Sequence, residues 1–495
     1  MLFYEMINSI KEQITEMPKL ADFDPNKLCY DSRIVESGDV FFAIKGLNYD
    51  GNKYIDEAFL KGAQAAITDS NISYSDTRVL HVKDVRKAMA LMSSRFYGFP
   101  SSKMMIIGVT GTNGKTTISS MIHHIFSFNG KKAGLTGTNG NIINNRFVKT
   151  SHTTPESVEL QHLLKQMADE NVEYAALEVS SHSLELNRVY GIDFDIAVFT
   201  NLTRDHLDFH GDMERYFISK KILFDSLKRI NSKNKKSTVI YNNDDEYGSR
   251  IVSTSEAEHI SYGLSSGSYK CKNYDMDFGG TKFDLLVPRN GDNISGIRVK
   301  TNLTGKFNIY NTIAAIAASK AAGLSYDGIL EAIKEFKPVE GRFNQLKLKN
   351  GVTAIVDYSH TPDSLLNALT TIRQIMDEMK SKGKIITVFG CGGNRDRTKR
   401  PVMGEIAAKN SDMAIVTSDN PRNEEPMDII NEIKSGITSD NYKVIENRED
   451  AVKYSIEMAG KNDVILVAGK GHETYQEIKG TKHHFSDKEV IEKYG

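Results

Sequence analysis

The chain has 495 residues, a length at which about three domains are usual, and its 63 basic and 64 acidic side chains leave a net charge of −1. This balance offers no general attraction to nucleic acid or to an anionic membrane, so we expect neither as a partner. No apolar run approaches the roughly 20 residues that a membrane helix needs. The three cysteines, Cys29, Cys271 and Cys391, form no CxxC pair. We therefore expect a reduced, cytoplasmic protein without a thiolate zinc site.

The first region, residues 1–101, is predicted to be a small mixed α/β domain. Residues 1–20 mix apolar and charged positions in a way that predicts an amphipathic helix and excludes a signal peptide. Short strands are expected at 39–46 and 65–68. The sequence Phe-Pro-Ser-Ser at 99–102 indicates a linker to the next domain.

A glycine-rich turn follows an apolar strand predicted at 104–107 and precedes a helix predicted at 118–128. Strand, turn and helix together are typical of a phosphate cradle. Backbone N–H groups face the anion, a lysine reaches the terminal phosphates and a threonine hydroxyl can hold Mg²⁺. The turn departs from the common pattern because Val109 takes the place of its first glycine. We expect nucleotide binding by this turn, with the contacts made by Gly111, Thr112, Asn113, Gly114, Lys115, Thr116 and Thr117.

From residue 102 to residue 338 we expect strands and helices to alternate, as in a doubly wound parallel sheet. Buried parallel strands are predicted at 174–179 and 196–200. Glu178 and His206 lie at the ends of these strands and could converge on the nucleotide. With Thr116 they would suit Mg²⁺ beside phosphates, although histidine is an unusual magnesium ligand. Either residue taken alone could instead be a hydrogen-bonded polar group at a strand end.

Lys220 is the most unusual residue of a helix predicted at 216–227. At about 100° per residue it lies in the middle of an apolar face that includes Tyr216 and Phe224. A lysine in such a place usually extends its amine to the solvent, and the residues alone favour that interpretation. Burial would instead lower the pKa of the amine. A neutral lysine can take up CO₂ to become a carbamate, which can bind Mg²⁺ as a carboxylate does.

Pro338 marks the expected start of a third region, residues 339–495, in which strands and helices alternate again. Strands are predicted at 355–356, 385–389, 414–417 and 464–468, each followed by a polar or glycine-rich loop. Arg342 could meet phosphates across a cleft, and Asp357 ends a strand, although both could belong to ordinary loops. Arg395, Arg422 and Glu473 would together suit a zwitterion with more than one carboxylate, unless they only form surface salt bridges.

Over essentially its whole length the chain resembles the Mur ligases, the ATP-dependent amide-forming enzymes of peptidoglycan synthesis. The resemblance implies an N-terminal uridine-nucleotide-binding domain (1–101), a central ATP-binding P-loop domain (102–338) and a C-terminal Rossmann-like domain that binds the amino acid (339–495). It implies that Lys115, His206 and Lys220 are catalytic. It also implies that Lys220 is carbamylated and that two Mg²⁺ ions are held by Thr116, Glu178, His206 and Lys220. The implied ATP contacts of the later segments are Asn308, Arg342 and Asp357.

Within the family the chain is most similar to members that catalyse the third ligation step, in which meso-diaminopimelate is joined to UDP-MurNAc-L-Ala-D-Glu through an acyl phosphate. The implied contacts to the UDP-dipeptide are Ser32, Thr153, Thr154, Ser180 and Arg188. The implied acceptor pocket consists of Arg395, Asp419, Asn420, Pro421, Arg422, Gly469 and Glu473. Lysine-adding relatives lack the arginine of the Asp-Asn-Pro-Arg motif. One departure is Leu186, where some relatives carry a glutamine.

Two other functions remain open from the sequence. One is a different ligase of the same fold, such as a folylpolyglutamate synthase or a lysine-adding relative, which the two substrate motifs argue against. The other is a P-loop switch or motor that hydrolyses ATP to move a partner. ATPase activity that requires both a UDP-dipeptide and an amino acid would exclude the motor. We expect a monomer.

Overall fold

A computed structural model describes residues 1–46, 49–70, 76–150, 152–228, 231–288 and 294–495. The chain forms two compact units: the first contains residues 1–108, 130–195 and 226–237, and the second contains residues 109–129, 196–225 and 238–495. Strand β6 (Met105–Thr110) passes from the first unit to the second. Helices alternate with mostly parallel strands in both units, so the fold class is α/β, as predicted. Among the described residues, no helix is long and apolar enough to cross a membrane.

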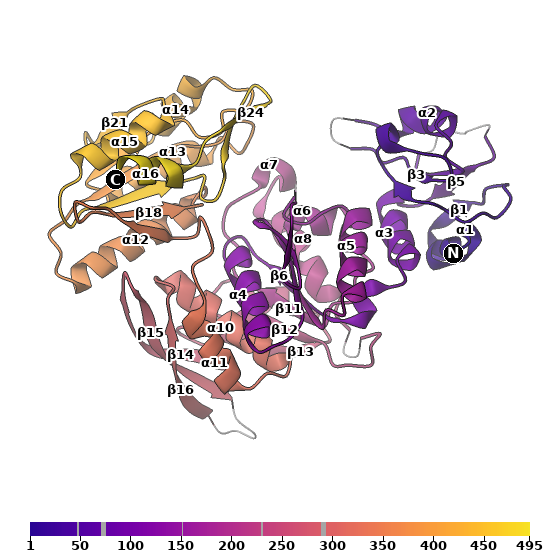
Figure 1. Cartoon of the computed structure of the whole chain (residues 1–495), viewed down its shortest axis with the longest axis horizontal. Coiled ribbons are helices and arrows are strands. Elements are labelled where there is room, and N and C mark those ends of the chain that lie inside the picture. The colour runs from indigo at the N-terminus through magenta and orange to yellow at the C-terminus, as the bar shows by residue number, and fades with distance from the viewer. Residues whose placement is uncertain (47–48, 71–75, 151, 229–230, 289–293) are drawn as a thin grey trace. The chain divides into compact units, whose positions relative to one another are not determined.

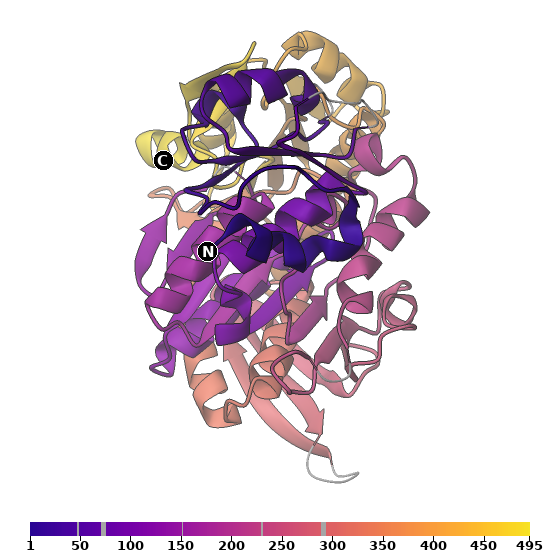
Figure 2. The same cartoon turned by 90° about the vertical axis from the view of Figure 1, so that its right-hand side faces the viewer.

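The first unit begins with a five-stranded sheet in the order β1-β5-β4-β3-β2, in which only β1 is antiparallel to its neighbour. One apolar cluster joins α1 and α3 to one face of this sheet, and a second joins α2 to the other face (Figure 2). The elements are α1 (Phe3–Ile7), η1 (Asn8–Gln13), β1 (Ile14–Glu16), β2 (Leu28–Cys29), η2 (Ser32–Ile34), β3 (Val40–Phe42), η3 (Gly51–Tyr54), α2 (Ile55–Leu60), β4 (Ala65–Thr68), β5 (Val79–Val82), α3 (Val85–Phe96) and η4 (Pro100–Lys103).

The single helix predicted over residues 1–20 is wrong. Helix α1 ends at Ile7, and the 3-10 turn that follows has a non-helical backbone at Ile10. The chain then becomes strand β1, in which Ile14 pairs with Val82 of β5. A strand partner that is distant in the sequence therefore overrides the local helical pattern.

The rest of the first unit contains a second group of strands. β10 (Tyr174–Glu178) fits the strand predicted at 174–179 and runs parallel to β7 (Ala133–Gly137). β8 (Gly140–Ile143) pairs antiparallel with β7, and β9 (Arg146–Val148) pairs antiparallel with β8. The helices are α5 (Ser157–Asp169) and α6 (Ser181–Glu185). Ser180 caps α6 by accepting a hydrogen bond from the backbone N–H of Ser183, so a polar side chain follows the end of β10.

In the second unit, β11 (Ile196–Phe199), β12 (Thr238–Asn242), β13 (Glu258–Gly263) and β14 (Tyr269–Asp277) are parallel neighbours. β14 then pairs antiparallel with β15 (Gly280–Pro288), which pairs antiparallel with β16 (Ile294–Thr301), as Figure 1 shows. Gly280, with φ at +142°, reverses the chain between β14 and β15. The expected alternation of strands and helices is therefore wrong for residues 258–301, where four strands follow one another.

One helix of this part of the second unit begins at the phosphate loop. Helix α4 begins at Lys115, directly after Gly114, and packs against α10. The elements are α4 (Lys115–Phe128), α7 (Leu207–His210), α8 (Met213–Asp225), α9 (Gly248–Ile251), α10 (Lys306–Ala321) and α11 (Tyr326–Glu335).

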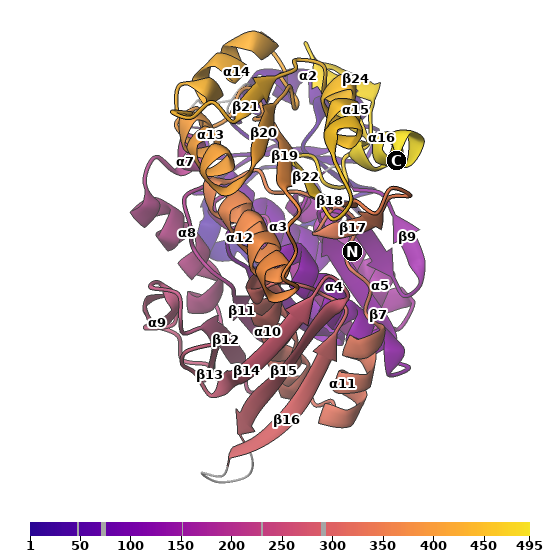
Figure 3. The ribbon, with the colours of Figure 1, turned by 90° about the vertical axis from the view of Figure 1, so that its left-hand side faces the viewer.

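The second unit ends with a six-stranded sheet in the order β17-β18-β22-β19-β20-β21, in which only β17 is antiparallel. Apolar clusters join α12, α13 and α14 to one face and α15 and α16 to the other (Figure 3). This is the predicted Rossmann-like arrangement. The elements are β17 (Asn344–Lys347), β18 (Thr353–Asp357), α12 (Pro362–Glu378), β19 (Ile385–Phe389), α13 (Lys399–Asn410), β20 (Met413–Val416), α14 (Pro426–Lys434), β21 (Tyr442–Val444), α15 (Arg448–Met458), β22 (Val464–Ala468), the hairpin of β23 (Tyr475–Ile478) and β24 (Thr481–His484), and α16 (Asp487–Tyr494).

Candidate active site

The glycine-rich turn has the backbone geometry of an anion-binding loop. Gly111 and Gly114 have φ values of +148° and +89°, which favour glycine. A Cβ on Gly111 would lie 1.8 Å from Thr200 Oγ1, and one on Gly114 would lie 2.5 Å from Asn311 Oδ1. The loop therefore keeps its shape only with glycine at both positions. Lys115 Nζ donates hydrogen bonds to the carbonyl oxygens of Gly111 and Thr112, each at 2.8 Å.

Lys220 does not extend to the solvent. Its side chain is buried on α8, its Nζ donates a hydrogen bond to the Gly111 carbonyl at 2.9 Å, and the amine lies 4.5 Å from the centre of the Tyr216 ring. Burial lowers the pKa of Lys220 well below its usual value, and the positive charge of Lys115 lowers it further. The solvent-extended interpretation is wrong, and burial disfavours the charged form of this amine.

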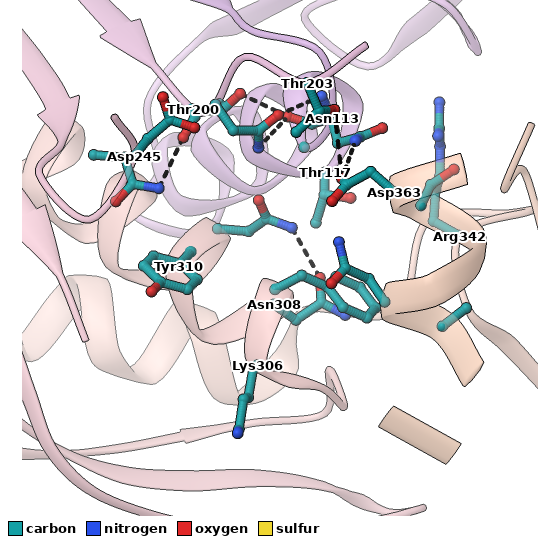
Figure 4. Close-up of a pocket in the computed structure, with 18 of the residues that line it drawn as sticks. Asn113, Thr117, Thr200, Thr203, Asp245, Lys306, Asn308, Tyr310, Arg342 and Asp363 are labelled. Atoms are coloured by element: carbon teal, nitrogen blue, oxygen red, sulfur yellow. Dashed lines mark hydrogen bonds between the residues drawn. The ribbon is translucent and has the colours of Figure 1, made fainter. Parts of the chain in front are cut away.

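A cavity of about 390 Å³ lies beside the loop, within the size range of small-molecule sites. Several segments that are distant in the sequence line it, among them the phosphate loop, residues 200–203, residues 242–245, helix α10 and the part of the chain after residue 340 (Figure 4). The lining includes the predicted residues Asn113, Gly114, Thr117, Asn308, Arg342 and Asp357. It also includes Asp244, Asp245, Tyr262, Tyr310 and Asp363, which were not predicted.

Polar side chains connect the loop to the part of the chain after residue 340. Arg342 Nη2 donates to Thr116 Oγ1 at 3.1 Å, so the arginine predicted to face phosphates does reach the loop. Asn113 Nδ2 donates to Asp363 Oδ2 at 2.9 Å. Asp357 Oδ2 accepts a hydrogen bond from the Phe343 backbone N–H at 2.6 Å. The sequence signal for Asp363 is its place in the first turn of α12, directly after Pro362.

The loop that follows β11 holds a buried carboxylate between two imidazoles. Asp205 Oδ2 lies 3.4 Å from His206 Nε2 and 3.8 Å from His360 Nε2. Burial raises the pKa of Asp205, but the hydrogen bond from His360 and the charge of His206 lower it more, so the net shift is strongly downward. Asp205 was missed in the sequence because only its burial between two histidines distinguishes it from other loop aspartates.

In the first unit, Glu178 is held rigidly at the end of β10. Its side chain is buried, and its two carboxylate oxygens accept hydrogen bonds from the Thr138 backbone N–H at 2.8 Å and the Thr138 hydroxyl at 3.1 Å. A Cβ on Gly137 would lie 2.1 Å from Glu178 Oε1. Within the described ranges no three His, Cys, Asp or Glu side chains group as a metal site. The four predicted magnesium ligands would not form such a cluster, because only two of them are His, Cys, Asp or Glu. The other two are a threonine hydroxyl and a lysine.

The residues predicted for the UDP-dipeptide largely meet in the first unit. Thr154 Oγ1 donates to the Glu178 carbonyl at 2.7 Å and accepts from the Ser180 backbone N–H at 3.2 Å, and Arg188 Nη1 donates to the Thr154 carbonyl at 3.1 Å. Thr153 Oγ1 lies 3.1 Å from Thr138 Oγ1. Glu156, which was not predicted, forms ion pairs with Arg188 at 2.9 Å and Arg86 at 3.3 Å. Ser32 is buried in the N-terminal sheet region, where its carbonyl accepts from Lys61 Nζ at 2.9 Å.

The predicted acceptor residues meet near the hairpin of β23 and β24. Asn420 Nδ2 donates to Glu473 Oε2 at 2.7 Å, and the buried Lys470, which was not predicted, donates to Glu473 Oε2 and to Asn420 Oδ1 at 3.1 Å each. A Cβ on Gly469 would lie 2.5 Å from Asp419 Oδ2, so glycine lets these loops approach.

The two guanidiniums predicted for this pocket differ in burial. Arg422 donates from Nη1 to the Gly393 carbonyl at 2.8 Å. Arg395 is exposed in the same loop as Gly393.

Comparison with known proteins identifies the family. The Mur ligase family catalytic domain matches residues 26–97, the Mur ligase middle domain matches residues 109–319 and the Mur ligase glutamate ligase domain matches residues 341–471. The chain belongs to the Mur ligase family. Members of this family use ATP. Each matched range falls inside one of the three predicted regions.

Individual Mur ligases are similar over nearly the full length. The UDP-N-acetylmuramoyl-L-alanyl-D-glutamate--2,6-diaminopimelate ligase of Clostridium botulinum is 46% identical over 474 residues, which are 94% of this chain and 94% of the relative. A solved structure of a ligase with the same name is 33% identical with a TM-score of 0.66, covering 95% of this chain and 94% of that one. The MurF ligase from Thermotoga maritima in complex with ADP is 20% identical with a TM-score of 0.61, covering 90% and 94%, and shows the likeness of fold.

Proposed function

We propose that this protein is the ATP-dependent ligase that adds meso-2,6-diaminopimelate to UDP-MurNAc-L-Ala-D-Glu, and so makes the UDP-tripeptide precursor of peptidoglycan. The observation that carries the proposal is the full-length similarity to ligases named for this reaction. The phosphate loop beside the cavity and the Asp-Asn-Pro-Arg motif near Glu473 support it. In this reaction ATP phosphorylates the γ-carboxylate of D-glutamate, and the amine of diaminopimelate then displaces phosphate from the acyl phosphate.

The loop residues Gly111 to Thr117 bind the ATP phosphates in this proposal. Lys115 donates to the loop carbonyls in the structure. In the proposed reaction it turns to the terminal phosphate of ATP and stabilises the negative charge that develops on the transferring phosphoryl group. Arg342, which already contacts Thr116, adds a guanidinium to the same phosphates. Asn308 and Asp357, which line the cavity, contact the rest of the nucleotide.

Thr116, Glu178, His206 and a carbamylated Lys220 hold two Mg²⁺ ions in this proposal. The fit rests on chemistry: Glu178 offers a fixed, buried carboxylate and Thr116 a hydroxyl, which are the hard oxygen ligands that Mg²⁺ prefers. The depressed pKa of Lys220 favours the neutral amine that reacts with CO₂. Bound there, Mg²⁺ stabilises the negative charge of the transferring phosphoryl group.

The remaining predicted residues bind the two substrates that are joined. Ser32, Thr153, Thr154, Ser180 and Arg188 contact the UDP-dipeptide. In the acceptor pocket, Arg422 and Arg395 bind the carboxylate that distinguishes diaminopimelate from lysine, and Glu473 binds an ammonium group. Asp419, Asn420, Pro421 and Gly469 shape the pocket. We also infer that the chain has three domains, with boundaries at residues 101 and 338, and that the enzyme is a monomer. We place it in the cytoplasm, where ATP and both substrates are available.

Phosphate release measured with the UDP-dipeptide and a panel of amine acceptors tests the proposed function. We expect ADP, phosphate and the UDP-tripeptide only when ATP, the UDP-dipeptide and meso-diaminopimelate are all present. Lys115→Ala should fold normally and lose at least about 10²-fold in rate, because it removes a cation at the transferring group. ATP hydrolysis that needs no amine acceptor, or a faster reaction with L-lysine, would contradict the proposal.

A further inference from the structure

The Asp419–Arg422 motif is fastened to the hairpin of β23 and β24 by backbone hydrogen bonds. Arg422 has φ at +51°, a left-handed conformation that is uncommon for a residue with a side chain. Its backbone N–H donates to the Glu477 carbonyl at 3.0 Å, and its own carbonyl accepts from the Lys479 N–H at 2.7 Å. These two bonds hold Arg422 in the unusual conformation and fix the direction in which its side chain leaves the backbone.

The same hairpin holds two other positions of the motif. Gln476 Nε2 donates to the Asp419 carbonyl at 2.6 Å. The Glu477 backbone N–H donates to Asn420 Oδ1 at 2.9 Å. Residues 476–479 therefore act as a frame for the motif, with one hydrogen bond to each of Asp419 and Asn420 and two backbone hydrogen bonds to Arg422.

Glu477 also reaches the guanidinium itself. Its Oε2 lies 3.5 Å from Arg422 Nε, while Arg422 Nη1 donates to the Gly393 carbonyl at 2.8 Å. These two attachments on different nitrogens fix both the position and the plane of the guanidinium. The side chains of Arg422 and Glu477 are 22% and 26% exposed, so the pair is still accessible to a ligand.

We propose that Glu477 is a positioning residue that determines acceptor specificity, because it orients the Arg422 guanidinium for the distal carboxylate of diaminopimelate. This inference rests on the proposed function. A planar guanidinium binds a carboxylate well only when its plane is aligned with it, so orientation before binding improves both affinity and selectivity. Glu477 acts through Arg422 and does not itself contact the substrate.

Steady-state kinetics of Glu477→Ala and Glu477→Gln test this role. We expect Glu477→Ala to raise the KM for meso-diaminopimelate about 10-fold or more, as small displacements of a binding group do, with kcat and the KM values for ATP and the UDP-dipeptide unchanged. The preference for meso-diaminopimelate over L-lysine should fall by the same factor. Glu477→Gln keeps a side-chain oxygen for Arg422 Nε and should show a smaller increase.

His483→Ala is the matched control, because His483 lies on the other strand of the same hairpin, opposite Gln476, and its side chain is exposed. It should leave every KM unchanged. The inference is overturned if Glu477→Ala leaves the diaminopimelate KM unchanged or lowers it, or if all three KM values rise together, as in general damage to the fold. A wild-type enzyme without diaminopimelate-dependent ligation would instead contradict the proposed function.

Discussion

Lys115 and Lys220 donate hydrogen bonds to the same carbonyl oxygen, that of Gly111, at 2.8 Å and 2.9 Å. Two ammonium groups this close repel each other, which is why the charge of Lys115 contributes to the lowered pKa of Lys220. Carbamylation would change the charge of Lys220 to −1. It would thereby replace the repulsion between the two side chains with an attraction.

Lys220→Ala should lose most ligase activity, because it removes the group that we expect to hold Mg²⁺. A short carboxylic acid added in solution should restore part of the rate by occupying the place of the carbamate. Lys221→Ala is the control, since Lys221 pairs with Asp225 at 2.5 Å on the same helix. Intact-mass measurement that finds only a free amine at Lys220, together with full activity in CO₂-depleted buffer, would refute the carbamate.

Gly137→Ala should disturb Glu178, because the three atoms nearest to the added Cβ all belong to the Glu178 side chain. The added methyl would lie 2.1 Å from Glu178 Oε1. The two hydrogen bonds from Thr138 hold the carboxylate in place, so it cannot move away without losing them. We expect activity to fall about 10–100-fold, with a higher Mg²⁺ concentration needed for the half-maximal rate. Gly296→Ala, where a Cβ meets nothing within 4 Å, is the control. An unchanged Mg²⁺ dependence would argue against Glu178 as a ligand.

Arg422→Ala should impair the use of meso-diaminopimelate far more than the use of ATP or the UDP-dipeptide. Without Arg422, the second carboxylate of diaminopimelate would leave water with no guanidinium to pair with it. The binding free energy lost should be roughly 2–5 kcal/mol, by analogy with truncated buried charge pairs. The loss should appear as a raised KM for the acceptor and a reduced preference over L-lysine. Arg397→Ala is a suitable control, because Arg397 is an exposed arginine that pairs with Glu432. Equal wild-type kcat/KM values for the two amino acids would overturn the acceptor assignment.

His472 should make the protein less stable as the pH falls from 6.5 to about 4. Burial lowers the pKa of His472 to about 4, and the charge of Arg342 adds to the effect. Between these pH values the unfolded chain binds more protons than the folded chain, so acidification favours unfolding. The expected loss is about 1–2 kcal/mol between pH 6.5 and pH 5. Urea unfolding of wild type and His472→Gln at both pH values measures it, and equal losses in the two proteins would contradict it.

Those parts of the site that depend on local pattern were predictable from the sequence. The phosphate loop is continuous in the sequence. The place of Lys220 on an apolar helix face was also predicted, but the residues alone favoured an amine that extends to the solvent, and the side chain is buried instead. The partners of those residues were not predictable. Asn113 and Asp363 are 250 residues apart, and Glu477 reaches Arg422 only because the hairpin bridges to that residue.

In the fold, too, local patterns were predictable and long-range strand partners were not. The predicted strand at 385–389 has the predicted limits because all five residues are buried and only Thr387 is not apolar. The antiparallel strands β14, β15 and β16 were not predicted. Burial alternates along β14 and β15 with a period of two residues, which is a strand signal, but the pairing order of strands is set by distant partners. The helix expected over residues 1–20 failed for the same reason, since β5 supplies the partner of Ile14.

The contacts that join the phosphate loop and the loop after β11 to the chain after residue 340 include three polar pairs: Arg342 with Thr116, Asn113 with Asp363, and His360 with Asp205. Polar groups of this kind exchange their partners for water at a small net cost, whereas an apolar junction would resist separation. In the proposed reaction these three pairs are therefore the contacts that can exchange partners as ADP leaves and the next ATP binds.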